Sequence, residues 1–82
     1  MTSAVVHGDG SWAALEQLSP DDRSAIDDVL IAWLDTGPPR DRPRRRAGVT
    51  LFEHDLRHVA VGITYVVDDH QQLVGVLRIS NL

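Results

Sequence analysis

Apolar residues recur every three or four positions along residues 20–36, the spacing of one face of an α-helix. The stripe consists of Ile26, Val29, Leu30, Trp33 and Leu34. Ser19 is suited to cap the free backbone N–H groups, and Pro20 suits the first helical position, where its missing N–H costs nothing. Gly37 and the two prolines after it end the pattern. The sequence therefore predicts a helix over residues 20–36.

The last third of the chain alternates with the period of two that is typical of β-strands. Residues 59–67 have Val59, Val61, Ile63, Tyr65 and Val67 on one face and Ala60, Gly62, Thr64 and Val66 on the other. Residues 50–55 and 73–79 are two further strands, and the polar residues 68–71 form a turn. The face with the small residues is expected to be open to solvent and shallowly concave.

The N-terminal residues predict a short strand over 4–7, closed by a glycine turn, and then a short helix capped by Ser11. Trp12, Leu15 and Leu18 would form the apolar face of this helix, and both tryptophans are expected in the core. The element order is β-α-α-β-β-β. It predicts an α+β fold in which two helices cover one face of a small antiparallel sheet.

Length and composition narrow the class of protein. The 82 residues suffice for one domain over 1–82. The absence of cysteine excludes disulfides, zinc fingers and thiol catalysis. No apolar run is long enough for a membrane span, and no secretory signal is visible. A cytoplasmic protein is the default expectation.

Charge is unevenly distributed, because the chain has a net charge of −4 while five of its eight arginines lie between residues 40 and 46. Prolines, glycines and mutual repulsion predict that residues 37–49 form a flexible loop. Arg44, Arg45 and Arg46 could bind phosphate or an acidic partner, since guanidinium groups bind pairs of oxygens. The alternative is a solvated linker. No aromatic residue is interleaved for base stacking, so nucleic acid is not favoured.

Glu53 and Asp55 are the candidate acid–base residues. On a strand they share a face, about 6.5–7 Å apart along it. That face is the open one, shared with Gly62 and Thr64, and Arg78 could share it and orient an anion. A carboxylate there could exchange protons with a small molecule. The alternative is a hydrated acidic surface.

No metal site or cofactor is predicted. His54 has the opposite strand parity to Glu53 and is expected to point towards the helices as a hydrogen-bonded residue. A site made from His54, His58 and Asp55 would need a turn that joins opposite faces. His7 and His70 are isolated and expected to be exposed. The sequence contains no glycine-rich phosphate loop.

The chain resembles the RelE/ParE toxin superfamily. Its two-helix hairpin matches SWAALEQLSPDDRSAIDDVLIAWLDTGPP, and its later strands match GITYVVDD and LVGVLRIS, with Tyr65 and Asp68 at the family's tyrosine and aspartate. The resemblance spans nearly the whole chain. It implies a microbial-RNase-like fold whose members cleave ribosome-bound mRNA or poison DNA gyrase and are neutralised by an antitoxin.

The departures from the family pattern concern the mRNA-cleaving residues. Glu53 and Asp55 stand where those members have two lysines, and Gly62 stands where they have the strand arginine. Asn81 and Leu82 lie where a late arginine is expected, and no catalytic tyrosine follows. Because cleavage needs cations around the phosphate, and an acidic face would repel it, we expect that this chemistry is lost.

Two functions follow from this sequence. The first is a toxin-like protein whose antitoxin-like or other protein partner covers the open face and the arginine segment. The alternative is a small-molecule enzyme of the acid–base isomerase, cyclase or lyase type that uses Glu53 or Asp55 above Gly62 and Thr64. Fold alone does not choose between them. No membrane partner is expected, and a homodimer is left open.

Overall fold

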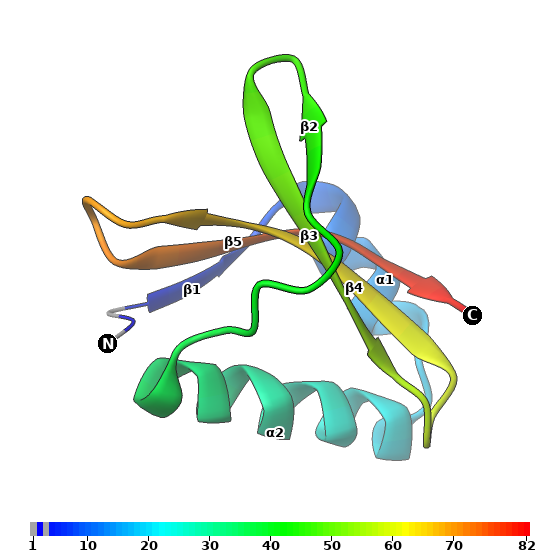
Figure 1. Ribbon diagram of the computed structural model, residues 1–82. Coiled ribbons are helices and arrows are strands. Elements are labelled where there is room, and N and C mark those ends of the chain that lie inside the picture. The colour runs from blue at the N-terminus through cyan, green and yellow to red at the C-terminus, as the bar shows by residue number, and fades with distance from the viewer. Residues whose placement is uncertain (1, 3) are drawn as a thin grey trace.

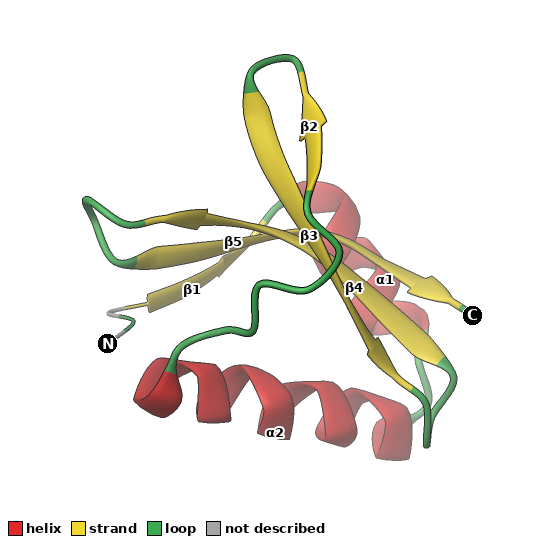
Figure 2. Cartoon of the chain, in the orientation of Figure 1, coloured by secondary structure: helices red, strands yellow, loops and turns green. Residues whose placement is uncertain are grey.

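The computed structural model describes residue 2 and residues 4–82, and within these it has two helices and five strands (Figure 1). In chain order the elements are β1 (Ala4–His7), α1 (Asp9–Gln17), α2 (Pro20–Thr36), β2 (Arg44–Arg46), β3 (Val49–Leu56), β4 (Val61–Asp68) and β5 (Leu73–Asn81). Figure 2 shows the arrangement of the helices and strands. Both helices contribute buried side chains to the same core as the sheet. The predicted α+β class is confirmed.

The sheet is mixed, with the strand order β1-β5-β4-β3-β2. Strands β2, β3, β4 and β5 pair antiparallel with one another, whereas β1 runs parallel to its neighbour β5. The prediction of a wholly antiparallel sheet is therefore wrong for β1. Parallel neighbours need a long crossover connection. Here that connection is the whole chain between α1 and β4, and no local turn signal in the sequence reveals it.

Helix α2 begins and ends where the sequence predicts. The side chain of Ser19 accepts a hydrogen bond of 3.2 Å from the backbone N–H of Asp22, and Pro20 is the first helical residue. Gly37 ends the helix with a φ of 83°, a conformation that favours glycine. Its N–H donates to the carbonyl of Trp33 at 2.9 Å. The helix therefore presents Ile26, Leu30 and Trp33 to the core.

Helix α1 begins two residues before the expected cap. Gly8 precedes it, and Ser11 lies buried inside the first turn, where its hydroxyl is 2.8 Å from Nδ1 of His7. His7 is accordingly half-buried rather than exposed, and this burial lowers its pKa. The prediction that Trp12 belongs to the core is also wrong, because Trp12 is 51% exposed. The fully buried side chains of this helix are Ser11 and Leu15, and Leu15 provides the apolar contact with the core.

Tyr65 occupies the centre of the core. It is fully buried, its ring lies 4.6 Å from the ring of Trp33 and 5.7 Å from that of Phe52, and its hydroxyl donates to the carbonyl of Pro39. The other buried residues are Leu15, Ile26, Leu30, Leu56, Val61, Ile63, Val74, Val76 and Ile79. The predicted division of β4 into a core face and an open face is thus confirmed.

Residues 44–49 form a hairpin where the sequence predicts only a loop. Arg46 pairs with Val49, and between them Ala47 and Gly48 have φ values of 51° and 79°. Two consecutive positive φ values characterise the type I′ turn, whose twist suits a two-residue hairpin. The prediction of an irregular segment therefore holds only to residue 43. Alanine rarely adopts a positive φ, so the sequence conceals this turn.

No helix among the described residues is long and apolar enough to span a membrane.

Trp33→Ala should lower the free energy of unfolding by about 3–5 kcal/mol, because it removes a large side chain from a packed core. Trp33 is 4% exposed and contacts the rings of Tyr65 and His54. Urea unfolding followed by circular dichroism measures the loss. Trp12→Ala is the matched control and should cost far less, since Trp12 is half-exposed. Equal losses would contradict this description of the core.

Tyr65 should make the protein less stable in alkali. Burial raises the pKa of its phenol to about 12. The folded state therefore holds this proton more tightly than the unfolded chain, and stability is complete below about pH 10 and falls as the pH approaches 12. The chain has no lysine, no cysteine and no other tyrosine. No other side chain therefore titrates mainly in this window.

The measurement compares urea midpoints of the parent and Tyr65→Phe on either side of the unfolded pKa. At neutral pH the variant should lose about 1 kcal/mol with the hydrogen bond to Pro39. In alkali the parent should weaken, whereas the variant should keep its neutral-pH midpoint. A parallel decline of both proteins would show that Tyr65 is not the titrating group.

Candidate binding groove

The open face of the sheet carries two rows of residues that run across β3, β4 and β5. One row consists of Glu53, Thr64 and Arg78, and the next consists of Asp55, Gly62 and Ser80. These rows follow from antiparallel pairing, which aligns side chains of one face across neighbouring strands. The predicted site residues of the sheet therefore lie on one surface.

A bulge in β5 directs Arg78 to this face. Val76 pairs with Tyr65, and Arg78 pairs with the residue just before Tyr65, so Leu77 is the extra residue. Without it, the alternation of the strand would place Arg78 on the same face as buried Val76. A bulge shifts that alternation by one position. Leu77 and Arg78 are consequently both exposed, while Ile79 returns to the core.

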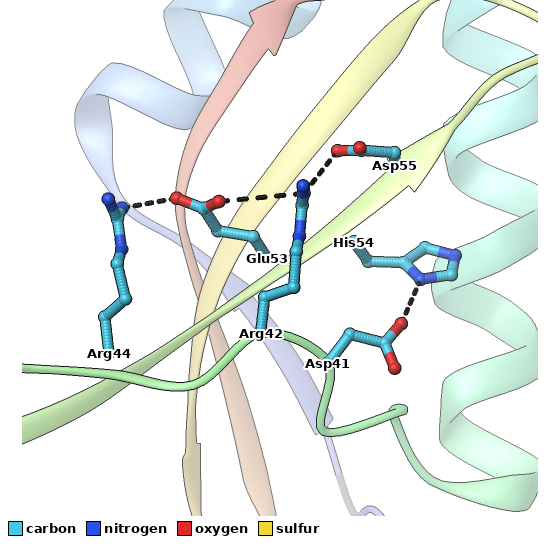
Figure 3. A network of polar contacts seen from close by, with 6 residues as sticks. All are labelled: Asp41, Arg42, Arg44, Glu53, His54 and Asp55. Atoms are coloured by element: carbon cyan, nitrogen blue, oxygen red, sulfur yellow. Dashed lines mark hydrogen bonds and ion pairs between the residues drawn. The ribbon is translucent and has the colours of Figure 1, made fainter.

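The arginine segment folds back over the acidic residues of β3 (Figure 3). Nη2 of Arg42 lies 2.7 Å from Oδ1 of Asp55 and 3.6 Å from Oε2 of Glu53. Arg44 donates to the other carboxylate oxygen of Glu53. Figure 3 shows Arg42 between the two carboxylates and Arg44 on the far side of Glu53. The two charged clusters noted in the sequence are therefore one cluster.

Together these residues enclose a groove of about 430 Å³. Its charged lining consists of Arg42, Arg44, Arg46, Arg78, Glu53 and Asp55. Four guanidinium groups against two carboxylates leave an excess of two positive charges. The expectation of an acidic open face is therefore wrong, because the hairpin supplies cations that the parity of β3 and β4 does not reveal.

The groove brings together nearly all of the predicted site residues. Arg45 is not part of the groove lining, because its guanidinium donates to the hydroxyl of Thr50. Thr50 has the same strand parity as the core-facing residues of β3, so it lies away from the groove. Sequence reasoning missed Arg42 as the residue that bridges both carboxylates. It also missed Leu77 and Leu82, which are 46% and 62% exposed and line the groove.

Gly62 lies in the floor of the groove beneath two side chains. A Cβ atom placed on Gly62 would be 3.2 Å from Cδ2 of Leu82 and 3.3 Å from Oδ1 of Asp55. Mid-strand glycine occurs where another group must approach the backbone closely. At this position neighbouring side chains of the same protein make that approach.

A second set of contacts fixes the segment that leads into the hairpin. Oδ2 of Asp41 lies 3.1 Å from Nδ1 of His54, and the carbonyl of Asp41 accepts the N–H of Glu53 at 3.1 Å. Arg40 bonds to Asp69 at 2.6 Å. These contacts hold the hairpin arm close to β3, so they also position Arg42.

His54 lies on the core side of β3, as predicted, with its ring edge against Trp33 at 5.7 Å. Among the residues that the structure describes, no three histidine, aspartate or glutamate side chains are grouped so as to hold a metal ion.

The sequence matches no model of a known protein family and no curated protein. The structure is similar to that of the isolated E. coli RelE toxin, with a TM-score of 0.78 and 16% identity over 98% of this chain and 84% of that one. The toxin–antitoxin complex RelBE of Mycobacterium tuberculosis matches with a TM-score of 0.76 and 18% identity over 100% of both chains.

An archaeal RelE–RelB complex from Pyrococcus horikoshii matches with a TM-score of 0.77 and 15% identity over 99% of this chain and 96% of that one. These identities establish likeness of fold. The similarity extends over 98–100% of this chain, and the chain therefore has a RelE-like fold.

Proposed function

We propose that this protein acts by binding an antitoxin-like protein partner over the open sheet face, and that it does not cleave mRNA. The observation that carries this proposal is the pairing of Arg42 and Arg44 with Glu53 and Asp55. The pairing holds the arginine arm over the sheet, and Arg46 and Arg78 make the resulting groove net positive. Such a groove offers a partner both charge and shape, which are the requirements of specific association.

The structural neighbours support a protein partner. Two of the similar structures reported above are RelE chains in complex with RelB antitoxins, from Mycobacterium tuberculosis and Pyrococcus horikoshii. A protein with the same fold and an exposed charged groove is suited to a partner of the same kind. Leu77 and Leu82 at the groove add apolar area, which favours a protein partner over a purely polar ligand.

The departures from the mRNA-cleaving members argue against cleavage here. Those members have two lysines where this chain has Glu53 and Asp55, and an arginine where it has Gly62. The carboxylates already accept the guanidinium groups of Arg42 and Arg44. Two of the groove's four cations are thereby committed within the protein. They are not free to stabilise the charge that develops on a phosphate during cleavage.

The same pairing disfavours the small-molecule enzyme. A general acid or base must be free to exchange a proton with its substrate. Glu53 and Asp55 instead hold the arm that carries Arg42. We therefore assign Glu53 and Asp55 the role of positioning the groove's cations rather than that of a general acid or base.

Partner capture tests the proposal. Tagged protein purified from its native host should retain a specific protein, which is then identified by mass spectrometry and reconstituted from pure components. Gly62→Val should stay folded, because the end of Leu82 and the carboxylate of Asp55 can move, yet it should weaken the complex by filling the groove. Gly10→Ala is the control and should bind normally, since no described atom other than those of its chain neighbours and its own helix backbone lies within 4 Å of its Cβ position.

The outcomes separate cleanly. A folded Gly62→Val variant that captures the partner as well as Gly10→Ala does would place the interface elsewhere. An unfolded Gly62→Val variant would show that this glycine serves internal packing. Thr64→Arg then provides the test, because it enlarges a side chain that already lines the same groove. Absence of any reproducible partner would refute the proposed function.

Expression of the protein should not arrest translation, and the purified protein should leave ribosome-bound mRNA intact. A reconstituted translation reaction with primer extension across the message measures cleavage directly. Codon-specific cuts in the presence of the protein would contradict the proposal. They would mean that Arg44, Arg46 or Arg78 supplies the cations that the lysine positions lack.

A further inference from the structure

Two arginines of the groove remain available for a ligand. Arg46 and Arg78 are exposed and line the groove. Among the described residues neither guanidinium group makes a hydrogen bond or an ion pair, in contrast to those of Arg42 and Arg44. Since Glu53 and Asp55 are matched by Arg42 and Arg44, the excess positive charge of the groove belongs to Arg46 and Arg78.

Carboxylates are the anions that this groove already accepts. Arg42 contacts oxygens of both Glu53 and Asp55, and Arg44 binds the second oxygen of Glu53. Arginine binds carboxylate through directed, charge-assisted N–H···O bonds. The internal pairs therefore illustrate how an acidic side chain of a partner would meet the neighbouring guanidinium groups.

Apolar surface lies beside the free cations. Leu77 is placed next to Arg78 by the bulge, and Leu82 extends over Gly62. Both leucines are half-exposed or more. None of the described residues that line the groove is aromatic, so these residues offer no stacking surface of the kind with which proteins bind single-stranded nucleic acid. Arginine beside leucine suits a protein segment with both acidic and apolar side chains.

We propose that the groove binds an acidic, leucine-bearing segment of the partner, with its carboxylates on Arg46 and Arg78 and its apolar side chains on Leu77 and Leu82. This inference rests on the proposed function and identifies the chemistry of the partner at the same site. Glu53 and Asp55 compete with the segment, because they place negative charge on the groove floor.

A labelled peptide of repeated Glu-Leu-Glu-Gly units tests this by fluorescence anisotropy in low salt. The combined change Arg46→Gln and Arg78→Gln should weaken binding about tenfold, as expected when charge-assisted bonds are lost. Arg45→Gln removes the same charge outside the groove and is the matched control. Its affinity should change little. A peptide with glutamine in place of glutamate should bind weakly to every variant.

Glu53→Gln tests whether the peptide binds in the groove, because attraction to the overall charge of the protein would respond equally to a change outside the groove. It removes one negative charge from the groove and frees Arg44, so the affinity for the acidic peptide should rise. The rise should be larger than after Asp69→Asn, which removes a negative charge outside the groove. An equal rise in both variants would overturn the proposal. So would equal losses from the Arg45 change and the Arg46 and Arg78 changes.

A single-stranded RNA of equal charge distinguishes the other class of polyanion. RNA that binds more tightly than the peptide and loses affinity with Arg46 and Arg78 would overturn the proposal in favour of a nucleic-acid groove. The partner-capture experiment separates the two proposals. Capture that survives the Arg46 and Arg78 changes would refute this inference while leaving the proposed function intact.

Discussion

The pairing of Arg42 and Arg44 with the carboxylates of β3 is the constraint on which the open side of this structure depends. Like charges so close together oppose a compact, regular segment. The segment becomes ordered by lying against β3, where Glu53 and Asp55 face outwards and accept Arg42 and Arg44. Each exposed ion pair contributes only about 0–1 kcal/mol. The pairs act together with Asp41 and with the β2–β3 hairpin, so that the arm is fixed at several points.

The parts of the fold that depend on local burial could be predicted from the sequence. Helix α2 and the two faces of β4 follow from periodicity, because one side of each must be apolar to meet the core. Three features depend on strand pairing or backbone conformation that the local pattern does not reveal, and they could not be predicted. They are the parallel partner of β1, the bulge at Leu77 and the hairpin that closes at Ala47. The prediction that Trp12 is buried was wrong for a related reason. Helical spacing shows which residues share a face, but not how much of that face other elements cover.

The candidate groove shows a different limit of sequence reasoning. Strand parity predicts the face on which Glu53, Asp55, Gly62 and Thr64 lie. It does not predict the face of Arg78, because the bulge in β5 turns this residue to the groove. The arginines are a separate feature in the sequence, because a loop of unknown path gives no basis for placing them on a face. Only the structure shows that each charged group is the other's counterion. Local charge is therefore a poor guide to the net charge of a folded surface.

The likeness of fold at low sequence identity has a physical origin. Identity of 15–18% with RelE structures at TM-scores near 0.77 means that the backbone arrangement is similar while most residues differ. The core side of the sheet constrains side chains through packing, whereas the groove side faces solvent. The hairpin can thus supply cations from β2 while β3 carries carboxylates, without disturbing Tyr65 or Trp33. The fold consequently does not determine the chemistry of the groove, which depends on how this chain pairs its own charges.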